Sequence, residues 1–395
     1  MRFSPREMAR RYALTRGLLD DRGLEGLVIF GNSGVNRHNH ANGFWLSQWQ
    51  DVHHAYLVVP RHDDAALYVG LANHVPNARE LSDVPVIEWG GYDAGETIAN
   101  RLRAVGVERG RVGLVGVDAT WNVGMPWQHY LRLRELLPVV ELVDATADYA
   151  ALRRIKSAEE IERLRGAAAL SDLAVRTLVD VAKPGMAETE LVALVEESYR
   201  RRGGTTRITF LRSMPMDAPN GCVPAQNPSE RRLESGDVII TEFSASLCGY
   251  SGQVHRPVFV GAEPTGEWLR MFAVAKEAYE RVGRGMTPGS TEGDAIRNAS
   301  VIGAAGYSIY DDLIHGYGTD YGPPLVDRSC VRYWRNGVEP PRGRTVERGR
   351  TIVIQPNPIT PDERMGLQLG ALTVVTDAGA ESLHTLPFEP LIAES

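Results

Sequence analysis

Residues 233–260 read LESGDVIITEFSASLCGYSGQVHRPVFV, and this stretch gives the clearest indication of the fold. Two runs rich in β-branched and aromatic residues, at 237–246 and 250–260, flank the short turn LCG, which predicts a pair of adjacent strands. Gln253 and His255 are two residues apart on the second run, so their side chains face the same side of a sheet. The stretch therefore predicts two strands with polar side chains gathered on one face.

The chain around this stretch predicts an α+β domain. Residues 157–160 (SAEE) form a capping box that opens a long helix of period 3.6, and the segment KPG at 183–185 ends it. Strand pairs and helix pairs then follow in separate groups, which is typical of α+β folds. Further helices are expected at 188–201, 267–284 and 291–305, and further strands at 350–354 and 370–376.

The first half of the chain has a different pattern. Residues 4–7 (SPRE) form a capping box with proline at the first helical position, which opens a helix to about residue 21. Short apolar runs then alternate with helical stretches, which predicts an α/β sandwich. The runs lie at 26–30, 56–59, 67–69, 84–87 and 112–115. We predict two domains, residues 1–150 and 151–395, with the boundary near 148–156.

The composition is that of a globular protein. Of the 395 residues 43% are hydrophobic, and 43 basic against 50 acidic side chains give a net charge of −7. This balance argues against nucleic acid or an anionic membrane as a partner. The sequence has no signal-peptide pattern and no apolar run of about 18 residues, and its three cysteines indicate neither a disulfide framework nor a zinc site. We expect a cytoplasmic protein that acts on a small molecule.

Five segments, in order along the chain, resemble the pita-bread fold family of creatinase, prolidase and aminopeptidase P. They are RRIKSAEE at 153–160, LESGDV at 233–238, GYSGQVHRPVF at 249–259, HGYG at 315–318 and GRTIVIQP at 349–356. The first half of the chain is similar to this family in size and strand pattern only. The resemblance implies an α/β N-terminal domain, an α+β pita-bread C-terminal domain and a homodimer.

The resemblance also implies where a metal site would lie, and the residues there depart from the family pattern. Metallopeptidases of this family hold two divalent ions with two Asp, one His and two Glu, because such cations need anionic oxygens and imidazole. The corresponding positions hold Glu242, Gln253, Thr319, Gln355 and, by a looser match, Gly370. One carboxylate with two amides, a hydroxyl and a glycine lacks the charge to gather two cations. We therefore predict no catalytic metal and no other cofactor.

Creatinase is a family member that works without metal, through a histidine and two glutamates. The segment AQNP at 225–228 resembles creatinase locally, but Gln226 stands where the histidine is expected. His255 and Gln355 fall at the two glutamate positions, and His53 falls at the first of the arginines that hold the substrate carboxylate. The sequence therefore argues against creatine as the substrate.

The side chains that remain at this predicted site suit acid–base chemistry on a small polar metabolite. We predict that Glu242 orients or deprotonates, that His255 shuttles a proton, and that His315 helps to bind the substrate. Gln253 and Gln355 are expected to hydrogen-bond a carbonyl or amide. The other substrate-binding candidates are Gln226, Thr319, Tyr250, Trp45 and His53. The hypothesis is a metal-independent, creatinase-like enzyme for hydrolysis, cyclisation or elimination at a C–N or related bond.

Each assignment has a structural alternative. Glu242 and His255 could form an ion pair that fills a lost metal site, His315 could be a turn residue, and Trp45 could be a packing residue. Gln253 and Gln355 could simply keep hydrogen bonds without charge. At the level of function, the alternative is a non-catalytic pseudo-peptidase that binds a small ligand, peptide or protein. A third interpretation is a peptidase in which Glu242, His255 and His315 hold a single metal ion.

Overall fold

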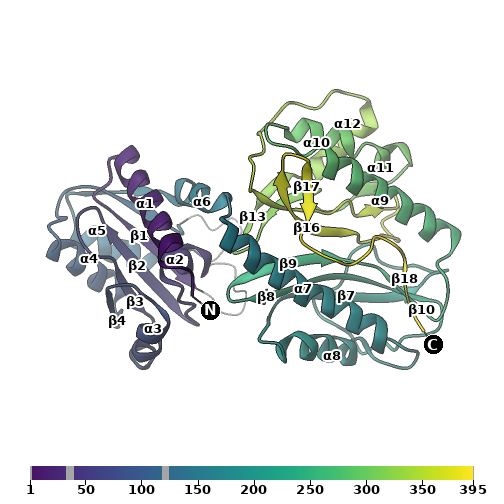
Figure 1. The fold of residues 1–395 in the computed structure, drawn as a ribbon, viewed down its shortest axis with the longest axis horizontal. Helices are drawn as coiled ribbons and strands as arrows, with labels where there is room; N and C mark the ends of the chain where they lie inside the picture. The colour runs from purple at the N-terminus through teal and green to yellow at the C-terminus, as the bar shows by residue number, and fades with distance from the viewer. Residues whose placement is uncertain (1, 33–39, 118–123, 395) are drawn as a thin grey trace. The chain divides into compact units, whose positions relative to one another are not determined.

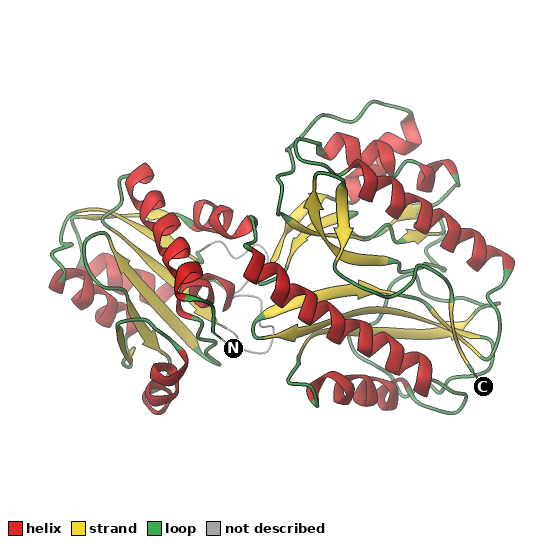
Figure 2. Cartoon of the chain, viewed as in Figure 1, coloured by secondary structure: helices red, strands yellow, loops and turns green. Residues whose placement is uncertain are grey.

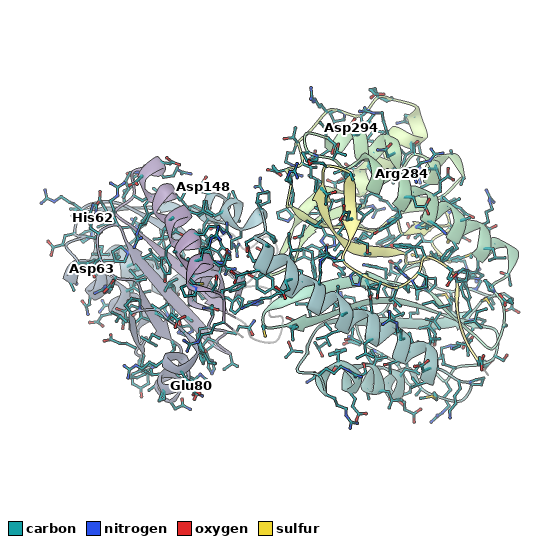
Figure 3. The ribbon with its side chains drawn as sticks, in the orientation of Figure 1. His62, Asp63, Glu80, Asp148, Arg284 and Asp294 are labelled. Carbon is teal, nitrogen blue, oxygen red and sulfur yellow. The ribbon has the colours of Figure 1, made fainter. Side chains whose placement is uncertain are left out.

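The computed structural model describes residues 2–32, 40–117 and 124–394, which form two compact units. The first unit is Met1–Arg154 and the second is Ile155–Ser395, and each has a sheet flanked by helices (Figures 1 and 2). His62 and Asp63 are exposed on the first unit, and Asp294 is partly exposed on the second (Figure 3). Within the described ranges, no helix is both long and apolar enough to cross a membrane.

The first unit is built on a six-stranded mixed sheet of order β4-β3-β2-β1-β5-β6. Its strands are β1 Gly26–Asn32, β2 His54–Pro60, β3 Ala66–Val69, β4 Val86–Trp89, β5 Gly110–Val115 and β6 Val140–Asp144. Its helices are α1 Pro5–Arg22, α2 His40–Ser47, α3 Val75–Leu81, α4 Ala94–Ala104, α5 Trp127–Leu136 and α6 Thr146–Arg154. The predicted α/β sandwich is therefore what the chain forms.

Both faces of this sheet are buried, and the side chains of β1 alternate between the two cores. Leu27 and Ile29 belong to a core that contains Trp45 of α2. Val28 and Phe30 belong to a second core, which contains side chains of α4 and α5. A central strand that is apolar on both faces is the usual consequence of helices on both sides of a sheet.

The second unit is built on a large curved sheet of order β13-β12-β14-β16-β9-β8-β10-β18, with β7 paired to β8 and β17 to β16. Its longer strands are β7 Thr205–Pro215, β8 Asp237–Leu247, β9 Tyr250–His255, β12 Ile314–Tyr317, β13 Tyr321–Val326, β14 Thr351–Ile354, β16 Gly370–Thr376 and β17 Gly379–Ser382. Its short strands are β10 Val258–Val260, β11 Ser308–Ile309, β15 Pro358–Ile359 and β18 Leu391–Ala393.

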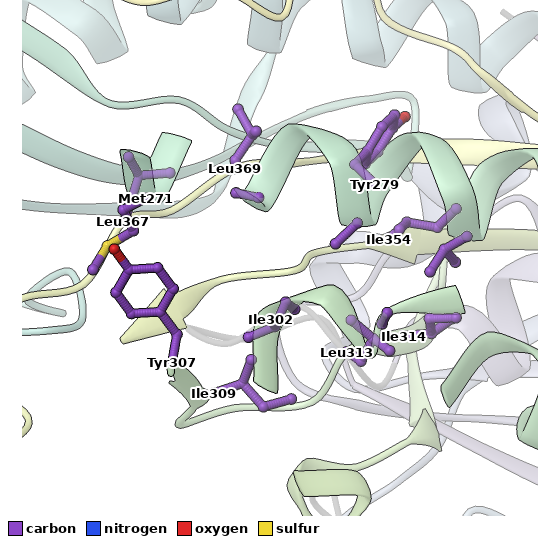
Figure 4. Close-up of a cluster of buried hydrophobic side chains, with 14 of the residues drawn as sticks. Met271, Tyr279, Ile302, Tyr307, Ile309, Leu313, Ile314, Ile354, Leu367 and Leu369 are labelled. Carbon is purple, nitrogen blue, oxygen red and sulfur yellow. The ribbon is translucent and has the colours of Figure 1, made fainter. Parts of the chain in front are cut away.

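Helices pack on both faces of this sheet. They are α7 Ala158–Val181, α8 Glu188–Arg200, α9 Gly266–Gly285, α10 Glu292–Asn298, α11 Val301–Ala304 and α12 Val331–Asn336. Ile239 and Phe243 of β8 lie in a core with α7 and α8, whereas Val238 and Ile240 lie in a core with α9. The helix α7 lies across β8 and β9 with α8 beside it (Figure 1), and it begins at a capping box between Ser157 and Glu160. The core with α9 also contains Ile314, Ile354 and Leu369 (Figure 4).

Two predicted elements are interrupted in the structure. The run 250–260 breaks at Arg256 and Pro257 into β9 and β10, because proline has no backbone N–H for the ladder. The helix expected over 291–305 is divided into α10 and α11. The last residue of β9, His255, pairs with Gly370 of β16, and this pairing brings a late strand next to the hairpin.

Candidate functional site

The central part of the site lies on the hairpin of β8 and β9. Gln253 donates from Nε2 to Glu242 Oε1 at 2.7 Å, and the same nitrogen lies 3.2 Å from His255 Nε2. Tyr250 and Val254 alternate with these residues and face α7, so Gln253 and His255 face away from it. Gln253 and His255 are buried, whereas Glu242 keeps a partly exposed side chain. The structure thus brings together three of the predicted residues.

The second part comes from β12 and the turn before it. His315 on β12 is buried, its Nδ1 lies 3.1 Å from the Gly316 carbonyl, and its ring stacks on Tyr321 with centroids 4.3 Å apart. The Tyr321 hydroxyl donates to Asp312 Oδ2 at 3.0 Å. The neighbouring residue Ile314 belongs to the core with α9, so His315 faces the opposite side of the sheet.

Gln355 connects β14 to the same turn. Its Nε2 donates to Asp312 Oδ1 at 2.9 Å and to the Asp312 carbonyl at 3.1 Å. Asp312 is buried, and it is a site residue that the sequence analysis missed. The available signal was the pair Asp311-Asp312, which lies two residues before the HGYG segment, where two acids precede a buried strand.

Several buried polar atoms of this cluster have no protein partner. Among the described residues these are Gln253 Oε1, His255 Nδ1, His315 Nε2 and Gln355 Oε1. Both glutamines turn their amide nitrogens toward carboxyl groups, which leaves their oxygens as open acceptors. If Nδ1 of His315 donates to the Gly316 carbonyl, Nε2 is an acceptor as well. Buried polar atoms are normally paired, so this inventory indicates a site for a polar ligand rich in N–H groups.

The pKa values of the two central titratable groups, Glu242 and His255, are shifted in opposite directions. Burial, together with the negative charges of Asp311 and Asp312, raises the pKa of Glu242 to about 8, and the hydrogen bond from Gln253 opposes this only in part. Burial, together with His315 and Arg256, lowers the pKa of His255 to about 3. Near neutral pH both side chains are therefore uncharged, so they do not form the ion pair considered from the sequence. Of these two groups, Glu242 is the one whose pKa lies closer to neutral pH.

The residues at the family's metal-ligand positions do not fit a dinuclear metal centre. Only one of the five positions, Glu242, carries a carboxyl group, whereas two divalent cations need several anionic oxygens. A Cβ on Gly370 would lie 2.7 Å from the Ile354 carbonyl oxygen and 3.0 Å from Gln355 Cβ, so a glutamate there would require backbone movement. No group of three or more His, Cys, Asp or Glu placed to hold a metal ion occurs in the described parts of the chain.

The remaining predicted residues in the second unit are placed less centrally. Thr319 is buried in the turn after β12, beside Gly318, whose carbonyl accepts a hydrogen bond from Ser251 of β9. Gln226 is exposed on the loop beside β7. Tyr250 lies on the other face of β9, where its hydroxyl donates to Glu160 of α7 at 2.9 Å. We therefore do not keep Tyr250 as a substrate-binding residue.

The two candidates in the first unit also differ from each other. Trp45 is fully buried, and its ring packs edge-to-face on Tyr149 with centroids 5.8 Å apart. Its side chain is part of the core, as the packing alternative predicted. His53 is exposed beside Asp51, whose Oδ1 accepts its backbone N–H at 3.0 Å. Of these two, only His53 has a side chain open to a ligand.

Comparison with protein families matches both units. The model of metallopeptidase family M24 matches residues 162–377, which is more than half of the chain. The chain belongs to metallopeptidase family M24. The creatinase/prolidase N-terminal domain model matches residues 11–155. The predicted family and fold class, an α/β domain followed by a pita-bread domain, are therefore confirmed.

Relatives of this M24 protein match over nearly its whole length. The uncharacterized peptidase YqhT of Bacillus subtilis is 27% identical over 379 residues, which are 95% of this chain and 98% of the relative. The Xaa-Pro dipeptidase of Pyrococcus furiosus is 23% identical and covers 87% of this chain and 90% of its own length. The solved structure of the Xaa-Pro dipeptidase from Bacillus anthracis has a TM-score of 0.77 at 21% identity, with 98% of this chain and 99% of that chain covered.

Proposed function

We propose that this M24 protein is a metal-independent hydrolase that cleaves a C–N bond of a small polar substrate by acid–base catalysis. The observation that carries this proposal is Glu242, a partly exposed carboxyl group in an otherwise buried polar cluster, with a pKa raised to about 8. A group whose pKa lies near the working pH is suited to transfer protons in both directions.

The polar atoms of the cluster that have no protein partner indicate which groups the substrate presents to them. The oxygens of Gln253 and Gln355 accept hydrogen bonds, so they bind N–H groups of an amide or amidine. The sequence had suggested a carbonyl or an amide as the partner of these glutamines, and two acceptor oxygens do not fit a carbonyl. Two of the relatives are named Xaa-Pro dipeptidases, and a peptide bond is one such C–N bond. Small peptides therefore belong with amides and amidines among the candidate substrates.

A balanced hydrolysis can be assigned to this chain's own side chains. His315 accepts at Nε2 a proton from a water molecule, whose oxygen forms the new bond to carbon. Protonated Glu242 gives its proton to the leaving nitrogen as the C–N bond breaks. His255 stays neutral and holds Gln253 in place through the 3.2 Å contact. The proton on His315 then returns to Glu242 through solvent, which restores both groups.

The test combines metal content with turnover. We expect the purified protein to hold less than one equivalent of divalent metal, and chelation to leave its activity on amides, amidines or Xaa-Pro dipeptides unchanged. Glu242→Gln should abolish that activity. Stoichiometric metal with chelator-sensitive turnover would instead support a metallopeptidase. Absence of turnover on the whole panel, with specific ligand binding retained, would favour the pseudo-peptidase. The homodimer and the cytoplasmic location remain predictions, and light scattering measures the first.

A further inference from the structure

A polar hollow on the second unit shares no lining residue with the Glu242 cluster. It has a volume of about 450 Å³, and β11, the short 3-10 helix Arg328–Cys330 and α12 line it. Three arginines line it, Arg328, Arg332 and Arg335, and no carboxylate does. The spacing of four and three residues places them on one side of a helical segment.

None of these arginines forms an ion pair within the described residues. The Arg328 guanidinium lies 4.8 Å from the centroid of the Tyr310 ring. Arg332 donates from Nη2 to the Tyr333 hydroxyl at 2.6 Å and lies over the same ring. These contacts hold two of the three guanidinium groups in place without neutralising their charge.

Two other arginines of the same unit are paired with acids, unlike the three that line the hollow. Arg297 of α10 forms ion pairs with Asp294 and Glu339, and Arg344 forms one with Glu292. The chain as a whole carries a net charge of −7, so acidic partners are not scarce. Three like charges in one hollow repel each other unless a counterion is bound between them.

We propose that this hollow binds a small phosphate-type oxyanion, either free phosphate or a phosphate ester. The planar guanidinium groups of Arg328, Arg332 and Arg335 match the paired oxygens of a phosphate group. The Ser308 hydroxyl and the Asn336 amide, which also line the hollow, supply neutral donors. The site is independent of whether the Glu242 cluster is catalytic.

The test measures binding of inorganic phosphate and of glycerol 2-phosphate to the full chain by calorimetry, at constant ionic strength with chloride as the balancing anion. We expect saturable binding at one site, and we expect R332Q/R335Q to weaken it by about a hundredfold, or about tenfold per arginine. R342Q is the matched control, because Arg342 is also exposed and also lacks an ion pair among the described residues. It should bind as the parent protein does.

The outcomes separate cleanly. Tighter binding of the ester assigns the hollow to a phosphorylated metabolite, and tighter binding of inorganic phosphate assigns it to the free anion. Acetate should bind more weakly than either, because it carries a single charge. The proposal is overturned if phosphate binds no better than chloride, or if R332Q/R335Q binds phosphate as well as R342Q does. All these substitutions are at exposed positions, so folding is not at issue.

Discussion

Two glutamates of the second unit, Glu188 and Glu242, differ in how many donors surround them. The buried carboxylate of Glu188 accepts four hydrogen bonds, from the backbone N–H and the hydroxyl of both Ser213 and Ser229, at 2.6–2.9 Å. Burial alone would raise its pKa, but these donors outweigh burial and lower it. Glu242 accepts a hydrogen bond from Gln253, and its pKa is raised to about 8.

The number of hydrogen-bond donors around a carboxyl group distinguishes a structural role from a role in proton transfer. A carboxylate that accepts hydrogen bonds from several donors is stabilised as an anion, so it does not readily take up a proton. A carboxyl group with few donors, beside other acids, holds a proton that it can transfer. Glu188 thus fixes the start of α8 to β7 and to the loop at Ser229, whereas Glu242 remains available for chemistry.

The largest expected effect is on turnover. Glu242→Gln keeps the shape and the partner Gln253 but removes the transferable proton, so kcat should fall by at least about a hundredfold. The measurement is the rate on the best substrate of the amide, amidine and dipeptide panel. Glu381→Gln, at an outer strand of the same sheet, is the control and should leave kcat unchanged. Equal rates for E242Q and the parent protein would remove Glu242 from the mechanism.

The next largest effect is on stability. Glu188→Gln replaces an acceptor of four hydrogen bonds by an amide whose own N–H₂ meets donors, so the free energy of unfolding should fall by about 3 kcal/mol. Chemical denaturation at pH 7 measures this. The kcat of the folded fraction should not change, which separates this variant from E242Q. A loss of turnover without a loss of stability would contradict the structural role.

Much of the fold could be predicted because its signals are local. The alternation of β8 and β9 places Gln253 and His255 on one face, and the structure brings both to Glu242. The same alternation already placed Tyr250 on the opposite face, where it bonds Glu160. Only the motif match had suggested it for the site. Period-two spacing was thus the better guide.

The missed part of the site depends on pairing between distant segments. Asp312 reaches Gln355 because Ile314 of β12 pairs with Ile354 of β14, some forty residues later along the chain. No local pattern encodes that register. Trp45 illustrates the opposite limit, since an aromatic cluster suits a core and a ligand site equally well in sequence. Its burial among core residues decides between them.

A smaller effect concerns stability at alkaline pH. The pKa of Glu242 is raised from 4.5 to about 8 in the folded protein, so its contribution to stability is complete below pH 4.5 and is lost as the pH rises toward 8. Glu242→Gln removes this loss. The variant should therefore gain on the parent protein between pH 6.5 and 9, by about 2 kcal/mol. Glu188→Gln should show no such gain, because its lowered pKa acts at acid pH. Parallel pH profiles for E242Q and the parent would refute the raised pKa.

The smallest effect is on stability at acid pH, and it arises from His255 of the same cluster. The pKa of His255 is lowered from 6.5 to about 3, so the stability that the neutral ring supports is present above pH 6.5 and is lost as the pH falls toward 3. His255→Asn cannot take up a proton, so its free energy of unfolding should fall less steeply than that of the parent, by about 1 kcal/mol between pH 7 and 5.5. His62→Asn, at an exposed position of the first unit, is the control and should follow the parent. If H255N and the parent lose stability equally over this range, the imidazole is protonated in the fold. The neutral role of His255 in holding Gln253 would then fail.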